Sequence, residues 1–144
     1  MQDRDKATVP VINPATEELI ASVPSRTKEE TLKSIAAAKA AFPAWKRLPA
    51  NEKAAMLHEA AAKMRAHHDE LVRLLTMEEG KPVPENDEEI WWSEETFDYY
   101  AEIGRRERGM VIPPGDPAQF NFVLKEPWGV VGCIVPWNYP ILLL

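Results

Sequence analysis

The stretch that decides the fold is Gly129-Val130-Val131-Gly132-Cys133-Ile134-Val135-Pro136-Trp137-Asn138-Tyr139-Pro140, followed by four apolar residues through Leu144. Residues 129–135 are apolar and rich in β-branched side chains, and they have the length of a buried strand. A proline-bounded loop follows, and the return to apolar residues after it predicts the start of a helix. This order indicates an open α/β sheet, in which ligands bind where strands deliver loops at their carboxyl ends.

The composition fits one soluble domain with a hydrophobic core. The 144 residues are 45% hydrophobic and 28% charged, and 17 basic against 23 acidic residues give a net charge of −6. This charge argues against a nucleic-acid partner, and no window approaches the ~18 apolar residues of a membrane span. Residues 1–6 are polar and lead into no apolar signal core, and the single cysteine fits a reducing compartment. We therefore expect a cytoplasmic protein with no membrane partner.

Local signals in the first half predict a hairpin and then helices. Asn13-Pro14-Ala15-Thr16 is turn chemistry between two short β-type runs, so residues 9–23 are expected to form a hairpin. Thr27 and Glu30 form a capping box, and the helix behind it is expected to kink or end at Pro43. An alanine-rich helix should follow from about residue 49.

The second half predicts two more helices and a strand. The adjacent His67 and His68 indicate a break between two helices, which we interpret as a solvated bend. Gly80 indicates a helix end in the left-handed conformation. Apolar residues recur at helical spacing in residues 85–104, and most of the other positions are acidic. Glu89, one of these acidic residues, is therefore expected to lie on a solvated face of the helix. Residues 120–125 alternate apolar and polar side chains, as a half-buried strand does.

Four motifs, in this order, resemble the aldehyde dehydrogenase superfamily, whose members are NAD(P)-dependent enzymes that oxidise aldehydes to acids. The motifs are Asn13-Pro14-Ala15-Thr16, Glu78-Glu79-Gly80-Lys81-Pro82, Tyr99-Tyr100-Ala101, and Glu126-Pro127-Trp128-Gly129-Val130-Val131-Gly132 leading to Pro136-Trp137-Asn138-Tyr139-Pro140. The last is the most specific. One departure is Glu17, which stands where the family usually has glycine, so the hairpin turn must be made differently.

The resemblance implies an α/β fold, namely the N-terminal part of a Rossmann-like cofactor-binding domain with a helical N-terminal segment and an oligomerisation strand. Residues 1–117 would form the hairpin and helices, 118–128 the oligomerisation strand, and 129–144 the first strand and loop of the Rossmann-like core. The chain is expected to stop inside that core, because the family's nucleophilic cysteine, general-base glutamate and ribose-reading residues all belong further downstream.

The resemblance also assigns the site residues. Asn138 would be catalytic, since its amide would hold the oxyanion formed when a thiolate attacks the aldehyde. The alternative is a loop asparagine that satisfies its own backbone. The residues that would line the cleft for NAD or NADP are Ile134, Val135, Pro136 and Trp137, with packing at a sheet end as the alternative. The resemblance offers Glu89 for the monovalent-cation site that some family members carry, but a solvated helix face is the preferred interpretation, and no metal site is predicted.

Cys133 is a candidate for the catalytic thiol because the family uses one. It lies in the apolar segment 129–135, however, and no cationic residue stands beside it in sequence to lower its pKa. We expect it to be a buried structural residue. The resemblance implies as partners a small-molecule aldehyde, the remaining part of the subunit, and further copies in a dimer or tetramer. The chain by itself is expected to be inactive. The alternative function is a non-catalytic product that acts only as a folding or oligomer-interface module.

Overall fold

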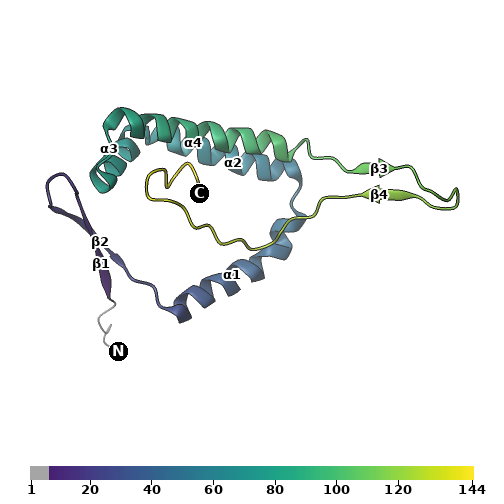
Figure 1. The fold of residues 1–144 in the computed structure, drawn as a ribbon, viewed down its shortest axis with the longest axis horizontal. Helices are drawn as coiled ribbons and strands as arrows, with labels where there is room; N and C mark the ends of the chain where they lie inside the picture. Colours follow the sequence, from purple (N-terminus) through teal and green to yellow (C-terminus); the bar gives the residue numbers. More distant parts are fainter. Residues whose placement is uncertain (1–6) are drawn as a thin grey trace.

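A computed structural model describes residues 7–144, which form four helices and two separate antiparallel hairpins (Figure 1). The elements in chain order are β1 (Thr8–Ile12), β2 (Leu19–Pro24), α1 (Lys28–Arg47), α2 (Ala50–Ala66), α3 (His68–Glu79), α4 (Val83–Gly104), β3 (Met110–Ile112) and β4 (Asn121–Val123). Residues 1–6, on which the expected absence of a signal peptide rests, lie outside the described residues. No helix within the described range is long and apolar enough to cross a bilayer.

The predicted first hairpin is confirmed, and its turn is made by side-chain chemistry. β1 pairs with β2, with an irregularity between Val11 and Ile12. The Asn13 side-chain oxygen accepts hydrogen bonds from the backbone N–H groups of Ala15 at 2.9 Å and Thr16 at 3.4 Å. Glu17 then takes a left-handed backbone with φ of 62°. A side chain in that conformation costs about 1–2 kcal/mol, which a glycine would avoid.

Helix α1 confirms the capping box and does not end at Pro43, which was one of the two outcomes expected there. The Thr27 hydroxyl accepts from the backbone N–H of Glu30, whose carboxylate accepts from the N–H of Thr27 in return. The helix continues through Pro43 to Arg47. It ends before Leu48, which has an extended backbone conformation, because a residue that precedes a proline is disfavoured in the α-helical conformation.

Helices α2, α3 and α4 lie together in one layer, from which the β3–β4 hairpin projects as an arm (Figure 1). Helix α4 packs against α2 through small residues: Ala54, Ala61 and Ala101 are all buried. Val72 and Leu75 of α3 meet Ile90 of α4 in a small apolar cluster. Alanine at the contact lets the helix axes approach closely, as the alanine-rich sequence of α2 predicted.

Gly80 joins two of the sequence motifs in space. It has the predicted left-handed conformation, with φ of 76°, and ends α3. A Cβ at this position would lie 2.6 Å from Pro14 Cγ in the hairpin turn. The glycine is therefore required twice, for its backbone angle and for the close approach of the Asn13-Pro14 turn.

The acidic side of α4 faces cations of α2 and α3, so the reading of a solvated bend at His67 and His68 is wrong for His68. The His68 ring contacts Glu94 at 2.9 Å and Asp87 at 3.0 Å. His58 lies between Asp98 and Glu102 of α4. Arg65 contacts three α4 carboxylates, those of Glu94, Glu95 and Asp98.

These contacts predict how stability depends on pH. The carboxylates of Asp98 and then Glu102 raise the pKa of His58, and those of Glu94 and then Asp87 raise the pKa of His68, above the ordinary value of 6.5. A raised folded-state pKa contributes stability that is complete below about pH 6.5 and is lost as the pH rises through the raised pKa.

On the acid side the sign is opposite. Hydrogen bonds from His58 lower the pKa of Asp98 and of Glu102, so their contribution is lost as the pH falls. Because the pKa values of His58 and His68 are raised, we expect the melting temperature, measured by circular dichroism, to fall as the pH rises above 6.5. The double variant His58→Asn/His68→Asn should flatten that fall. The control is His67→Asn, whose ring lies on the surface against Glu70; an equal flattening in this control would contradict the assignment.

Residues 129–135 differ from the predicted buried strand. They pair with no strand in the part of the chain that the structure describes, and most of their side chains are exposed. Cys133 is exposed as well, so the expectation of a buried cysteine is wrong. The reason is physical: an apolar strand is buried only when neighbouring strands and helices cover it, and residues 7–144 provide no such neighbours for this one.

Candidate functional site

The loop that carries Asn138 is fixed from behind by the apolar residues that follow it. After leaving β4, the chain returns beneath the helical layer (Figure 1), and Ile141 packs against the cluster of Val72, Leu75 and Ile90. Residues 139–143 make one helical turn, in which the N–H of Leu143 donates to the carbonyl of Tyr139 at 3.2 Å. The predicted helix start after Pro140 is therefore present as a single turn.

Glu89 of α4 closes the open end of this turn. Its Oε1 accepts hydrogen bonds from the backbone N–H groups of Ile141 at 3.0 Å and Leu142 at 3.3 Å. The first N–H groups of a helical turn have no partner within the turn, and a carboxylate satisfies them well. Glu89 is 0% exposed, so its interpretation as part of a solvated face is wrong.

Lys81 connects the same carboxylate to the loop. Its ammonium contacts the other oxygen of Glu89, donates to the backbone carbonyl of Asn138 at 2.8 Å, and lies 4.0 Å from the centre of the Tyr139 ring. Burial alone would lower the pKa of Lys81, but its contacts with Glu89 and Glu79 outweigh burial and raise that pKa. Lys81 thus stays charged and bridges α4 to the Asn138 backbone.

Glu79 completes this group of charges. Its carboxylate lies 3.5 Å from the Lys81 ammonium, and neither carboxylate oxygen has a hydrogen-bond partner in the described chain. The 3.5 Å contact is an ion pair too long for a good hydrogen bond. Burial raises the pKa of Glu79.

The Asn138 side chain is free. No hydrogen bond from its carboxamide to any other residue of the described chain is present, although its backbone carbonyl is bound by Lys81. Asn13 shows the contrast, because its carboxamide oxygen is occupied by its own turn. The alternative reading, a loop asparagine that satisfies its own backbone, does not describe Asn138.

The four predicted cofactor residues lead up to this loop and are largely uncovered. Ile134 is 100% exposed and the Trp137 ring 81% exposed, while Pro136 is exposed and Val135 is half-buried. Trp137 and Asn138 border a shallow pocket of about 290 Å³ whose other walls include Glu79 and Lys81. The structure thus brings Trp137 and Asn138 together and leaves Ile134 outside that pocket.

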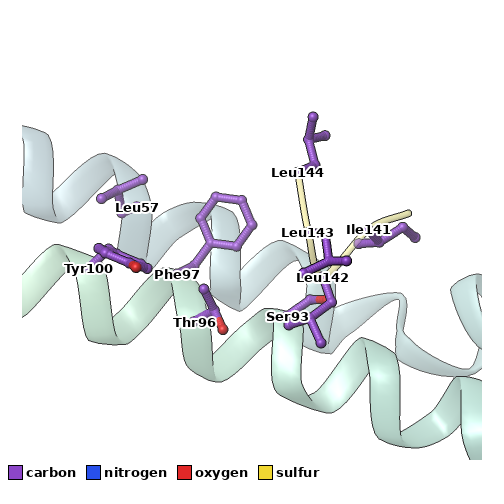
Figure 2. A pocket seen from close by; sticks show the side chains of 9 residues that line it. All are labelled: Leu57, Ser93, Thr96, Phe97, Tyr100, Ile141, Leu142, Leu143 and Leu144. Atoms are coloured by element: carbon purple, nitrogen blue, oxygen red, sulfur yellow. The ribbon is translucent and has the colours of Figure 1, made fainter. Parts of the chain in front are cut away.

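A second pocket is lined in part by residues 141–144. It has a volume of about 500 Å³ and runs between α4, α2 and the last four residues (Figure 2). The side chains that line it are mostly apolar: Leu57, Ser93, Thr96, Phe97, Tyr100, Ile141, Leu142, Leu143 and Leu144. It offers surface for packing and no titratable side chain for catalysis except the Tyr100 phenol.

Sequence reasoning missed the pair Lys81 and Glu89, although a signal was present. The polar residues Asn86, Glu89 and Ser93 continue the apolar face of Ile90 and Ala101 at helical spacing, and all are buried. Polar side chains in phase with an apolar stripe are buried with it and must find partners. No cluster of three or more potential metal ligands occurs within residues 7–144.

Comparison with known proteins agrees with the motif order and the fold. The profile of the aldehyde dehydrogenase family matches residues 1–144, and this chain belongs to that family. The mitochondrial succinate-semialdehyde dehydrogenase of Arabidopsis thaliana is 41% identical over 140 residues, which are 97% of this chain and 26% of that protein.

Two solved structures have the same arrangement of helices and strands. A crystal structure of an Escherichia coli NADP-dependent enzyme superposes with a TM-score of 0.92 at 38% identity, over 95% of this chain and 28% of that one. A betaine aldehyde dehydrogenase from Staphylococcus aureus, in complex with NAD⁺, gives a TM-score of 0.91 at 32% identity, over 99% of this chain and 29% of that one. The chain spans between a quarter and a third of the length of these relatives.

Proposed function

We propose that this chain supplies the oxyanion-binding side of the active site of an NAD(P)-dependent aldehyde dehydrogenase. In that reaction water adds the second oxygen, a hydride leaves the substrate carbon, and a carboxylic acid is formed. The nucleophilic thiolate and the general base would come from the remaining part of the subunit. The Asn138 side-chain N–H would donate a hydrogen bond to the aldehyde oxygen as that oxygen becomes negative.

The observation that carries the proposal is the free carboxamide of Asn138 on a backbone that is itself fixed. An oxyanion donor is effective when it is oriented beforehand and need not give up another bond at the moment of reaction. Lys81 holds the Asn138 carbonyl and Glu89 holds the turn behind it, while the side chain stays available. An amide also donates without titrating, so its donor strength does not change with pH.

The cofactor would lie beside residues 134–137. The exposed side chains of Ile134 and Trp137 and the unpaired backbone leading to them are free to contact a nicotinamide cofactor, as the resemblance implies. When bound, NAD⁺ or NADP⁺ accepts the hydride. The exposed thiol of Cys133 fits a reducing compartment such as the cytoplasm.

The substrate proposed first is a semialdehyde, which carries a carboxylate at the end opposite its aldehyde group. This choice is supported by the 41% sequence identity of the chain to the succinate-semialdehyde dehydrogenase of Arabidopsis thaliana. Succinate semialdehyde is therefore the first aldehyde to test, with betaine aldehyde as the comparison substrate.

The test uses a complete subunit, made by joining this chain to the part of the Escherichia coli NADP-dependent enzyme that follows the matched region. We expect the complete subunit to reduce NADP⁺ in the presence of succinate semialdehyde, followed at 340 nm. The 144-residue chain alone should give no turnover with NAD⁺ or NADP⁺. A folded complete subunit without turnover would favour the non-catalytic module, and turnover by the purified chain alone would contradict the proposed division of the site.

We further propose that the β3–β4 arm joins subunits in a dimer or tetramer. The arm is a two-stranded hairpin with unpaired edges, which is marginally stable alone and prone to pair with another strand. Apolar side chains are exposed on both of its strands and just beyond them: Met110, Val111, Ile112, Phe120, Phe122, Val123 and Leu124.

We expect Phe122→Asp to lower the oligomer mass of the complete subunit, because it places a charge in the proposed apolar interface. Light scattering after size-exclusion chromatography measures the mass. The matched control is Asn121→Asp, since neighbouring side chains of a strand point to opposite faces. An unchanged mass for Phe122→Asp would exclude the arm as the interface.

A further inference from the structure

The contacts of the Asn138 loop come from two residues far away in the sequence and not from the loop itself. Lys81 lies 57 residues before Asn138, and Glu89 lies 52 residues before Ile141. Neither side chain forms a hydrogen bond with the Asn138 carboxamide. Both act on the backbone that follows the Asn138 Cα, one on the Asn138 carbonyl and the other on the N–H groups three and four residues later.

We propose that Glu89 and Lys81 are positioning residues for Asn138. Glu89 caps the 139–143 turn and thereby fixes where the turn begins. Lys81, held by the same carboxylate, fixes the Asn138 carbonyl. With the Asn138 carbonyl held by Lys81 and the N–H groups of Ile141 and Leu142 held by Glu89, the backbone from which the Asn138 side chain extends has a fixed position. This inference rests on the proposed role of Asn138.

The chemistry at Glu89 supports positioning rather than a role in binding a ligand. One carboxylate oxygen serves the two backbone N–H groups and the other meets the ammonium, so both oxygens are occupied. The side chain is 0% exposed, which leaves no path for a substrate to reach it. A charged acceptor makes shorter and stronger hydrogen bonds than a neutral one, so the charge itself matters for holding the turn.

The apolar contact behind the loop cannot replace these bonds. Ile141 packs on the cluster of Val72, Leu75 and Ile90, which holds the turn against the helices. Apolar contacts are non-directional, so they fix the distance of the turn from α4 but not its rotation. Hydrogen bonds to defined atoms supply that orientation.

The first readout does not depend on activity. In the 144-residue chain, Glu89→Gln should speed amide hydrogen exchange at Ile141 and Leu142 by about tenfold or more, the size expected for weakening charge-assisted hydrogen bonds. The matched control is Glu88→Gln on the same helix, because Glu88 is exposed and, within residues 7–144, accepts a hydrogen bond only from the Trp92 indole. It should leave both amides unchanged. Unchanged exchange in Glu89→Gln would overturn the proposal.

The second readout separates positioning from general stability. In the complete subunit, Glu89→Gln should lower kcat about tenfold and leave KM for the aldehyde within about threefold. When Asn138 is already alanine, the same change should have little further effect on kcat, because there is no amide left to position. An equal loss in both backgrounds would overturn the proposal.

The two proposals fail in different ways. If Asn138→Ala leaves kcat unchanged while Glu89→Gln still releases the two amides, the catalytic role of Asn138 is wrong and the capping by Glu89 stands. If Glu89→Gln does not fold, Glu89→Asp gives the same test, since it keeps the charge near Lys81 but withdraws the carboxylate from the turn. Retained exchange protection and kcat in Glu89→Asp would overturn the proposal.

Discussion

Asn138→Ala in the complete subunit is expected to lower kcat for aldehyde oxidation by about 10²–10³-fold, the typical cost of removing one oxyanion donor. The loss should fall on kcat more than on KM, because the amide bond strengthens as negative charge develops on the substrate oxygen. Cofactor affinity should change little. Steady-state kinetics with succinate semialdehyde, together with a direct titration of NADP⁺ binding, measure both effects.

Two further variants make this result specific to the amide. Asn138→Asp has nearly the same shape, but its carboxylate can only accept hydrogen bonds, so it should lose at least as much activity as alanine. Asn121→Ala removes an exposed asparagine from strand β4 and should leave kcat unchanged. If the kcat of Asn138→Ala lies within threefold of the kcat of the subunit without substitutions, Asn138 does not stabilise the oxyanion.

Lys81→Met is expected to destabilise the 144-residue chain by about 3–5 kcal/mol, the usual cost of removing one partner of a buried ion pair. The side chains involved are 11% exposed for Lys81 and 0% for Glu89. Methionine fills much of the space of the lysine stem but leaves the Glu89 charge without its ammonium. A loss of this size is a large fraction of the 5–15 kcal/mol that stabilises a typical domain.

Urea unfolding followed by circular dichroism measures the change. Lys63→Met is the matched control, because Lys63 pairs with Glu59 on the surface, where both side chains are exposed. Exposed pairs contribute about 0–1 kcal/mol, so the control should be nearly neutral. Equal unfolding midpoints for the two variants would show that the Lys81–Glu89 pair is not a buried pair in solution.

Local signals in the sequence predicted most of the helix and turn boundaries correctly. The Asn13 turn, the Thr27 capping box, the break before His68 and the left-handed Gly80 each depend on atoms within a few residues of one another. The family was also evident from the sequence, because its motifs are short segments of contiguous residues and three of the four include a turn or loop. At Pro43, where a kink or an end was expected, α1 did not end; it continued to Arg47 and ended where Leu48 precedes Pro49.

What the tertiary structure alone decided is the environment of side chains whose partners are distant in sequence. Glu89 is an ordinary acidic residue in a row of acidic residues until the 139–143 turn brings two N–H groups to it and Lys81 brings a cation. Cys133 is apolar in its sequence context but exposed, since burial requires neighbouring strands that residues 7–144 do not provide. A sequence thus determines where its backbone turns, because those bonds are local. Burial and charge pairing are settled only when separate segments pack together, because both depend on which atoms exclude water from a group.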